Sequence, residues 1–170
     1  MSAVSACSAA VQAFGERRFE RWHGLPHECR LDDLVALAPL LNQGVARGRR
    51  GRRERWLLSR MVTFEAYVEP VRAWFDEQEM LVLLEADYPT LPTGPEWLIQ
   101  ALGEPEARLD SYLDLVLLRG GEWAYPSRGL SIALNVETGR LLRLAVYAGT
   151  SLETYLDDLR LDTTPGDLQR

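Results

Sequence analysis

Three side chains that can bind a transition metal lie close together in the chain: His23, His27 and Cys29. A zinc or iron site built on them would take a carboxylate such as Asp32 or Asp33 as its fourth ligand. A His-x3-His pair binds metal from one side of a helix, and Gly24 and Pro26 disfavour a helix here. No second cluster of cysteine and histidine completes the set. We therefore expect no metal or other cofactor, and a small metal enzyme is only the third functional hypothesis.

Carboxylate pairs are the next candidates for chemistry, because two such groups can divide the roles of acid and base. Asp32 and Asp33, like Asp157 and Asp158, are neighbours on predicted helices and point in different directions. The side chains at positions 85 and 87 share one face of a predicted strand and can converge. A glycosidase also needs a defined separation across a cleft. No nucleophile elbow, phosphate-binding loop, dinucleotide fingerprint or His-Glu-x-x-His motif occurs, so we expect no enzyme.

The densest run of charge is rich in arginine: Arg47, Arg49, Arg50, Arg52, Arg53 and Arg55, with Glu54 among them. Six arginines less one glutamate give this run +5, so the rest of the −6 chain carries −11. Three interpretations fit the run. It is an arm for phosphate or RNA, a docking segment for an acidic partner, or a solvated loop that offsets the acidity of the chain. Trp56 is the only aromatic residue beside it, which disfavours RNA.

Composition narrows the class of protein and its compartment. A net charge of −6 is unusual for a nucleic-acid-binding protein, and no stretch of 18 apolar residues could cross a membrane. Two cysteines in 170 residues do not form a disulfide framework, so a reducing, cytoplasmic location is expected. Val4–Cys7 has the local form of a lipoprotein processing site. We expect no signal there, because the segment before it lacks a basic region and an apolar run.

Any of these side chains would be positioned by a helix followed by a β-meander, a unit that is seen twice. The first unit has a helix over Leu31–Leu41, then strands over Arg55–Phe64, Val71–Phe75 and Met80–Ala86. The second has a helix over Pro95–Leu102, then strands over Tyr112–Leu118, Trp123–Tyr125, Leu130–Val136 and Leu141–Tyr147. The strands show apolar residues at alternate positions, and Gly and Pro mark the turns. The arginine-rich segment Asn42–Gly51 is expected to be a loop.

These elements predict an α+β fold in which two helix-plus-antiparallel-meander repeats form two small sheets or one continuous sheet. Apolar residues spaced by three and four over Val4–Phe14 predict an N-terminal helix within residues 1–21. The two halves are assigned to residues 22–92 and 93–160, joined by the proline-rich segment Tyr88–Pro95. Thr150 or Ser151 is expected to cap a final helix, and residues 161–170 to be a frayed tail.

One face of the predicted sheet carries side chains suited to a binding surface. If Leu142, Leu144 and Val146 face the helices, Arg143 and Tyr147 face away from them. Arg72 and Trp74 occupy the matching positions of an earlier strand, and Ser131, Ala133 and Asn135 leave low relief between them. With Arg50 and Arg53 from the arginine-rich run, the predicted contact set is Arg50, Arg53, Arg72, Trp74, Asn135, Arg143 and Tyr147. The alternative is a second buried face, covered by the N-terminal helix.

The second unit, with Leu102–Pro105 after its helix and Trp123–Tyr125 before an alternating hairpin, resembles the repeat of the β-lactamase-inhibitor-protein-like fold. Small outer-membrane-assembly lipoproteins share that repeat. The first unit, which begins with Trp22–Pro26 and Asp32–Leu34, resembles a diverged copy. The chain departs from those families because it lacks a signal peptide and paired cysteines. The resemblance implies a non-enzymatic protein whose sheet grips another protein, and in size and acidity the chain is also similar to bacterial immunity proteins.

The leading functional hypothesis is therefore a protein-binding module that neutralises a bacterial toxin or enzyme by steric occlusion. Its acidic surface would steer a basic partner, and aromatic and arginine side chains would supply most of the affinity. The alternative is an adaptor or chaperone-like component of a secretion or assembly machine. Such a protein would carry an extended segment along a sheet edge by strand addition.

Overall fold

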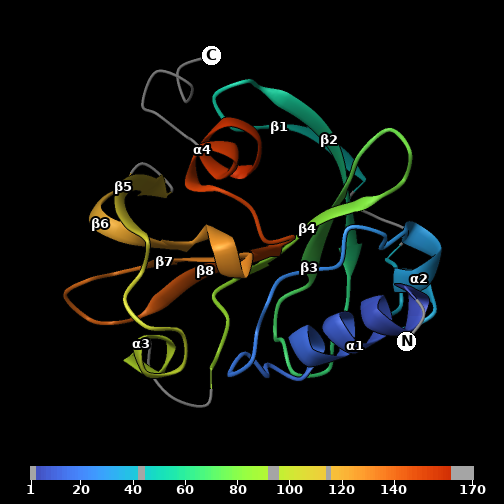
Figure 1. The fold of residues 1–170 in the computed structure, drawn as a ribbon, viewed down its shortest axis with the longest axis horizontal. Helices are drawn as coiled ribbons and strands as arrows, with labels where there is room; N and C mark the ends of the chain where they lie inside the picture. Colours follow the sequence, from blue (N-terminus) through green and yellow to red (C-terminus); the bar gives the residue numbers. More distant parts are fainter. Residues whose placement is uncertain (1–2, 42–44, 92–95, 114–115, 162–170) are drawn as a thin grey trace.

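The computed structural model describes residues 3–41, 45–91, 96–113 and 116–161. All the strands form a single eight-stranded antiparallel sheet in the order β1-β2-β3-β4-β8-β7-β6-β5 (Figure 1). The strands are β1 (Ala46–Arg50), β2 (Arg55–Val62), β3 (Val71–Phe75), β4 (Leu81–Asp87), β5 (Ala107–Leu113), β6 (Val116–Tyr125), β7 (Leu130–Leu134) and β8 (Leu141–Tyr147). The predicted α+β class with antiparallel strands is confirmed, and of the two arrangements that the sequence left open, the structure has the single continuous sheet.

Three helices lie on one face of this sheet, which we call the outer face. They are α1 (Ala3–Gly15), α2 (Leu31–Val35) and α3 (Glu96–Leu102). Each helix contributes a fully buried apolar side chain to the core with the central strands, namely Phe14, Leu34 and Leu98. Burial of apolar surface, at roughly 25 cal/mol per Å², makes this layer the main core of the molecule.

The opposite face, which we call the inner face, is covered in part by the C-terminal helix. This helix consists of α4 (Leu152–Thr154) and a π-helical turn, η2 (Tyr155–Leu159). The Ser151 side chain caps it by accepting a hydrogen bond from the backbone N–H of Thr154 at 3.1 Å. In Figure 1 the sheet curls so that β1–β2 and β5–β6 approach this helix from two sides. A smaller apolar cluster forms beneath it around Leu57, Trp74 and Tyr147.

Three strands, β1, β5 and β6, differ from the sequence-based prediction. Residues 46–50, expected to lie in a loop, form the edge strand β1, even though the run has few residues with high β-propensity. Tertiary contacts decide this case, because a Cβ at Gly48 would lie 2.7 Å from the Trp74 ring, so only glycine allows this approach. The predicted strand Tyr112–Leu118 instead spans the ends of β5 and β6, where Ser111 pairs with Leu118. Residues 114–115 of this predicted strand lie outside the described residues, and no glycine or proline between Ser111 and Leu118 interrupts the pattern in the sequence.

The predicted helix over Leu31–Leu41 is also shorter, because α2 ends at Val35 and Leu40 forms a β-bridge with Val62. Pro39 lacks the N–H that a continuing helix needs. Parts of the predicted linker and most of the predicted tail, residues 92–95 and 162–170, lie outside the described residues. No helix of the described chain is both long and apolar enough to cross a membrane.

Cys7 of α1 and Cys29 form a disulfide with their Cα atoms 5.4 Å apart, and both are fully buried. The expectation that these cysteines are unpaired is therefore wrong. The sulfurs come together because α1 packs beside α2, which closes a separation of 22 residues that the sequence alone did not pair. The cytoplasmic location was inferred from unpaired cysteines and stays a prediction without that premise.

Candidate binding site on the inner face of the sheet

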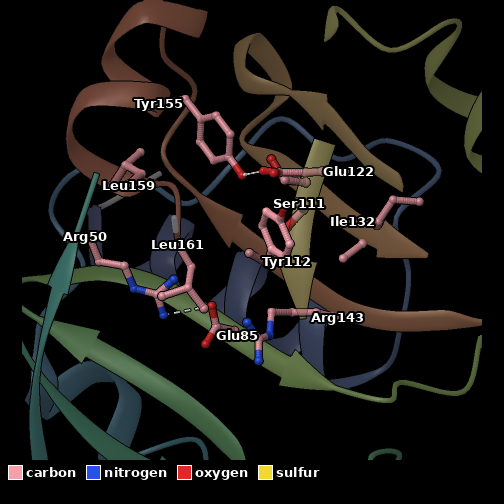
Figure 2. Close-up of a pocket in the computed structure, with 13 residues that line it drawn as sticks. Arg50, Glu85, Ser111, Tyr112, Glu122, Ile132, Arg143, Tyr155, Leu159 and Leu161 are labelled. Atoms are coloured by element: carbon pink, nitrogen blue, oxygen red, sulfur yellow. Dashed lines mark hydrogen bonds and ion pairs between the residues drawn. The ribbon is translucent and has the colours of Figure 1, made fainter. Parts of the chain in front are cut away.

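A small cavity of about 40 Å³ lies on the inner face between the central strands and the C-terminal helix. Its size suits a few water molecules. Figure 2 shows the side chains that surround it, which come from both halves of the sheet and from the C-terminal helix. Charged and hydroxyl groups dominate, including Arg50, Glu85, Glu122, Ser131, Arg143 and Tyr155. Buried polar groups of this kind are rare in small domains and mark a candidate site.

The centre of the site is a buried ion pair. The guanidinium of Arg50 lies 2.8 Å from the carboxylate of Glu85, and each side chain is only 2% exposed. Arg50 starts on the edge strand β1 and passes over Trp74, whose ring centre is 4.6 Å from the guanidinium carbon. The curl of the sheet brings this edge residue to a carboxylate on the central strand β4 (Figure 2).

The ion pair continues into a chain of alternating charges, which we call the charged chain: Arg50, Glu85, Arg72, Asp87 and Arg143. Arg72 lies 3.0 Å from Glu85 and 2.8 Å from Asp87, and Arg143 lies 2.9 Å from Asp87. The sheet register explains the order, because Arg72 pairs with Glu85 across β3–β4 and Asp87 with Arg143 across β4–β8. Each charge therefore has an opposite charge directly beside it.

Glu85 and Arg72 of the charged chain remain ionised at physiological pH. Burial alone raises the pKa of the Glu85 carboxyl. The opposing field of the surrounding arginines is larger and lowers that pKa from 4.5 to about 2; they are Arg50, Arg143 and Arg72. For the Arg72 guanidinium, burial lowers the pKa, but the neighbouring Glu85 and Asp87 raise it above its ordinary value. Neither Glu85 nor Arg72 exchanges a proton near neutral pH.

A second polar cluster ties the C-terminal helix to β6. The Tyr155 hydroxyl donates a hydrogen bond to Glu122, and the Arg160 side chain donates to the same carboxylate at 2.8 Å. The Tyr147 ring stacks on Tyr155 at 5.1 Å, and its hydroxyl shares a 2.6 Å hydrogen bond with Ser131. Burial raises the pKa of both tyrosines well above 10, so both hydroxyls stay protonated.

The arginine-rich turn between β1 and β2 holds the other side of the C-terminal helix. The N–H groups of Gly51, Arg52 and Arg53 donate to backbone carbonyls of residues 160, 156 and 157 at 2.8, 3.0 and 3.0 Å. These bonds satisfy carbonyls that the end of a helix otherwise leaves unpaired. The Arg52 side chain also pairs with Asp157 at 2.6 Å. The part of the run at residues 50–53 thus serves the fold, and the acidic segment that Arg52 and Arg53 dock belongs to the same chain.

Five of the predicted contact residues share the inner face: Arg50, Arg72, Trp74, Arg143 and Tyr147. Their side chains are not equally accessible. Arg72 and Arg143 are 27% and 20% exposed, whereas Trp74 and Tyr147 are 8% and 0% exposed beneath the C-terminal helix and β1. The apolar part of the inner face, with Trp74 and Tyr147, is therefore buried, as the alternative prediction expected. It is covered by the C-terminal helix and not by the N-terminal helix.

The other two predicted residues lie elsewhere. Asn135 is in the β7–β8 loop, where its side-chain oxygen accepts hydrogen bonds from the N–H groups of Glu137 and Thr138. Arg53 is exposed in the β1–β2 turn and pairs with Asp157 at 3.4 Å. Glu122 and Tyr155 also line the cavity, although the sequence pattern did not predict them as site residues. The signal for Glu85 was present, since a glutamate interrupts the apolar strand β4.

The metal hypothesis loses its sulfur ligand, because Cys29 is held in the disulfide. The His23 ring lies 3.3 Å from Arg128, a cation that disfavours a metal ion nearby. Within the described ranges, no group of three or more His, Cys, Asp or Glu side chains could hold a metal.

Comparison with known protein families gives no match, and comparison with curated proteins also gives none. Among solved structures, the chain has a distant likeness to a DUF4309 family protein (YjgB) from Bacillus subtilis, at a TM-score of 0.45 and 9% sequence identity. That alignment covers 85% of this chain and 99% of the other. At this level the likeness supports no statement about function.

Proposed function

We propose that this chain is a non-enzymatic protein-binding module that neutralises a bacterial toxin or enzyme by occluding its working surface. The observation that carries the proposal is the outer end of the charged chain. There Arg72, Asp87 and Arg143 are fixed by mutual ion pairs and yet remain 27%, 26% and 20% exposed. Preorganised charges of both signs on a firm sheet give a partner specific contacts at low entropic cost.

The ionisation of the site favours binding over catalysis. A general acid or base works best with a pKa near the ambient pH. The pKa of Glu85 is about 2, and burial holds the pKa values of Tyr147 and Tyr155 far above neutrality. None of these groups is suited to donating and accepting protons in turn near neutral pH.

The distribution of charge favours a basic protein partner. Buried Arg50, together with Arg52 and Arg53, is already paired with carboxylates of the same chain. Exposed carboxylates in the loops that flank β3 have no such partner among the residues that the structure describes; they include Glu65, Glu69 and Glu77. A net charge of −6 therefore lies mainly at the surface, where it steers a basic protein toward the sheet.

Affinity purification followed by titration calorimetry tests the proposal. A partner is first identified by mass spectrometry of proteins that co-purify with the tagged chain from its source cells. Arg143→Ala should then weaken binding at least tenfold, because it removes an exposed end of the charged chain while Asp87 keeps Arg72 as its partner. Arg119→Ala, at an exposed arginine on β6, is the matched control. Unchanged affinity for a folded Arg143→Ala protein would remove the inner face from the proposal.

We also propose that the two halves are copies of one helix-plus-meander unit. The order of elements supports this, since α2 precedes β1 to β4 and α3 precedes β5 to β8. In the sheet the two sets of strands run in opposite orders and meet where β4 pairs with β8. Superposition of the halves over their four strands checks the idea, and a fit no better than that of unrelated meanders contradicts it.

The compartment needs its own test. The sequence favours the cytoplasm, but a buried disulfide is typical of proteins from oxidising compartments. Acid quenching of whole cells, alkylation of free thiols under denaturing conditions and mass spectrometry of Cys7 and Cys29 separate the two, because unfolding exposes both buried sulfurs to the reagent. Alkylated cysteines support the cytoplasm, and protected cysteines support an extracytoplasmic location.

A further inference from the structure

We propose that the outer edge of β1 captures an extended acidic segment of a partner protein by strand addition. The contact surface is a group of side chains that we call the edge patch: Arg47, Arg49, Trp56, Leu58 and Arg60. This site lies on the outer face of the β1–β2 hairpin, whereas the charged chain lies on the inner face. The inference therefore does not depend on the function proposed above.

The register of the hairpin builds the edge patch. Arg49 lies directly opposite Trp56, and Arg47 lies opposite Leu58. The guanidinium carbons of Arg47 and Arg49 are 5.1 and 5.7 Å from the centre of the Trp56 ring. Trp56 remains 54% exposed, although the other described tryptophans are buried or half-buried. An exposed indole held between two arginines is a typical anchor of protein interfaces.

The edge patch carries positive charge that ion pairs within the described chain do not neutralise. Arg47 and Arg60 form no ion pair within the described ranges, and Arg49 pairs only with the exposed Glu54 at 2.8 Å. Three arginines less one glutamate give the patch a local charge of +2 on a chain of net −6. The neighbouring Arg50, Arg52 and Arg53 differ, because they are paired with carboxylates of their own chain. The unpaired charge calls for carboxylates from outside.

The strand itself supplies the second half of the site. β1 ends the sheet, and no described strand pairs with its outer edge. Alternate residues of an antiparallel edge strand present N–H and C=O groups outward. An added strand would place every second side chain on the face that holds Arg47 and Arg49, roughly 5 Å from them. The partner segment should therefore carry Glu or Asp at alternate positions.

Other occupants fit this edge less well. A second copy of the chain would pair β1 with β1 and set arginines against arginines, which is destabilising. A single-stranded nucleic acid could stack a base on Trp56, but it would leave the N–H and C=O groups of the β1 edge unused.

Fluorescence anisotropy tests the inference with a labelled ten-residue peptide of alternating Glu and Thr. The control peptide has the same composition with all Glu residues in one block, so that only the spacing differs. Ten-residue oligothymidylate is the third probe. We expect the alternating peptide to bind at least tenfold more tightly than either of the others. Methylation of alternate amide nitrogens on the edge-facing side of the peptide should weaken binding at least tenfold.

Variants of the full chain locate the contact. Trp56→Ala and Arg47→Glu should each weaken binding of the alternating peptide at least tenfold, while Arg119→Glu, at an exposed arginine on β6, should leave it unchanged. Absence of saturable binding, equal binding of the blocked peptide, or wild-type binding by both edge variants overturns the inference, and the arginines then serve only to protect the edge. Tighter binding of the oligonucleotide replaces it with a nucleic-acid site. Capture of a folded partner that depends on Arg143 is unaffected by any of these outcomes.

Discussion

Glu85 shows how one residue sets the character of the inner face. A carboxylate on a central strand is costly to bury unless its charge is fully compensated. Arg50 and Arg72 both lie within 3.0 Å of it, and one of them comes from the far edge of the sheet. The residue is thus better explained as a fixed charge that orders arginines than as a group that reacts.

This compensation predicts a loss of stability in acid. The pKa of Glu85 is about 2 in the folded protein and 4.5 in the unfolded chain, where the carboxyl has no arginine beside it. As the pH falls, the unfolded chain therefore binds the proton first. The stabilisation is fully present above pH 4.5 and is lost as the pH falls toward 2. It amounts to roughly 3 kcal/mol. Urea unfolding at a series of pH values measures it.

The Glu85→Gln variant is the control for that measurement. It should be less stable than the wild type by about 3 kcal/mol at neutral pH, because it leaves Arg50 buried without its counter-charge. The difference between the two proteins should shrink as the pH falls below 4.5. A difference that is the same at pH 7 and pH 3 would assign the acid sensitivity to other carboxylates.

Side-chain direction could be predicted from the sequence, but side-chain burial could not. Alternation correctly placed Arg72, Trp74, Arg143 and Tyr147 on one face of the sheet. It said nothing of the cover over Trp74 and Tyr147, because that cover comes from Tyr155 and its neighbours. A period of two reports which residues share a face, and only tertiary contacts decide whether the face meets water.

Among the elements, the β1–β2 hairpin connects the most parts of the molecule. Its strand β1 forms one edge of the sheet and places Arg50 beside Glu85. Its turn binds the C-terminal helix by three backbone hydrogen bonds. Gly51 makes the last contact possible. Its φ of +74° suits glycine, and a Cβ there would lie 2.0 Å from the carbonyl oxygen of Asp157.

Gly51→Ala should therefore lower the free energy of unfolding by more than backbone strain alone explains. Gly103→Ala is the matched control, since Gly103 has a similar φ of +84° and nothing within 4 Å of its added Cβ. The control should lose about 1 kcal/mol from the left-handed backbone, and Gly51→Ala should lose about 3 kcal/mol once the helix is displaced. Equal losses in chemical denaturation would show that the turn does not hold the helix.

Prediction of the elements succeeded where the local pattern was strong. The bounds Val71–Phe75 and Leu141–Tyr147 are those of β3 and β8, because alternating apolar residues are flanked by clear turns. The run at 46–50 failed for the opposite reason: arginine and glycine have little preference for strands. That strand depends on Gly48 packing under Trp74 and on pairing with β2, which are contacts made by the fold.

At the level of the whole molecule, the Cys7–Cys29 disulfide cross-links two segments of the helical layer on the outer face. It joins α1 to the segment that leads into α2, across 22 residues, and lies wholly within the main core. A cross-link of this span stabilises a protein by about 3 kcal/mol, chiefly by restricting the unfolded chain. The bond therefore adds a sizeable fraction of the 5–15 kcal/mol typical of a whole domain.

The double variant Cys7→Ala with Cys29→Ala should lose about 3 kcal/mol of unfolding free energy. Wild-type protein in excess reductant should lose most of the same stability, and the variant should be slightly less stable still, because it also lacks the two buried sulfur atoms. Guanidinium unfolding with and without reductant provides the measurement. If reductant leaves the midpoint of the wild type unchanged while its thiols become titratable, the bond contributes nothing to stability.

The C-terminal helix covers the inner face through contacts with residues that lie about 105 positions earlier in the chain and are therefore synthesised first. Arg52 and Asp157 are separated by 105 positions, and three backbone hydrogen bonds cross the same gap. During synthesis, strands β1 to β3 leave the ribosome before the C-terminal helix is made, so the cover over Leu57 on β2 and Trp74 on β3 is still missing. The newborn chain thus passes through a stage in which this apolar area is bare to chaperones and to other nascent chains. Folding of the C-terminal helix onto the sheet buries these side chains, so a slow last step would prolong the period in which the chain can aggregate.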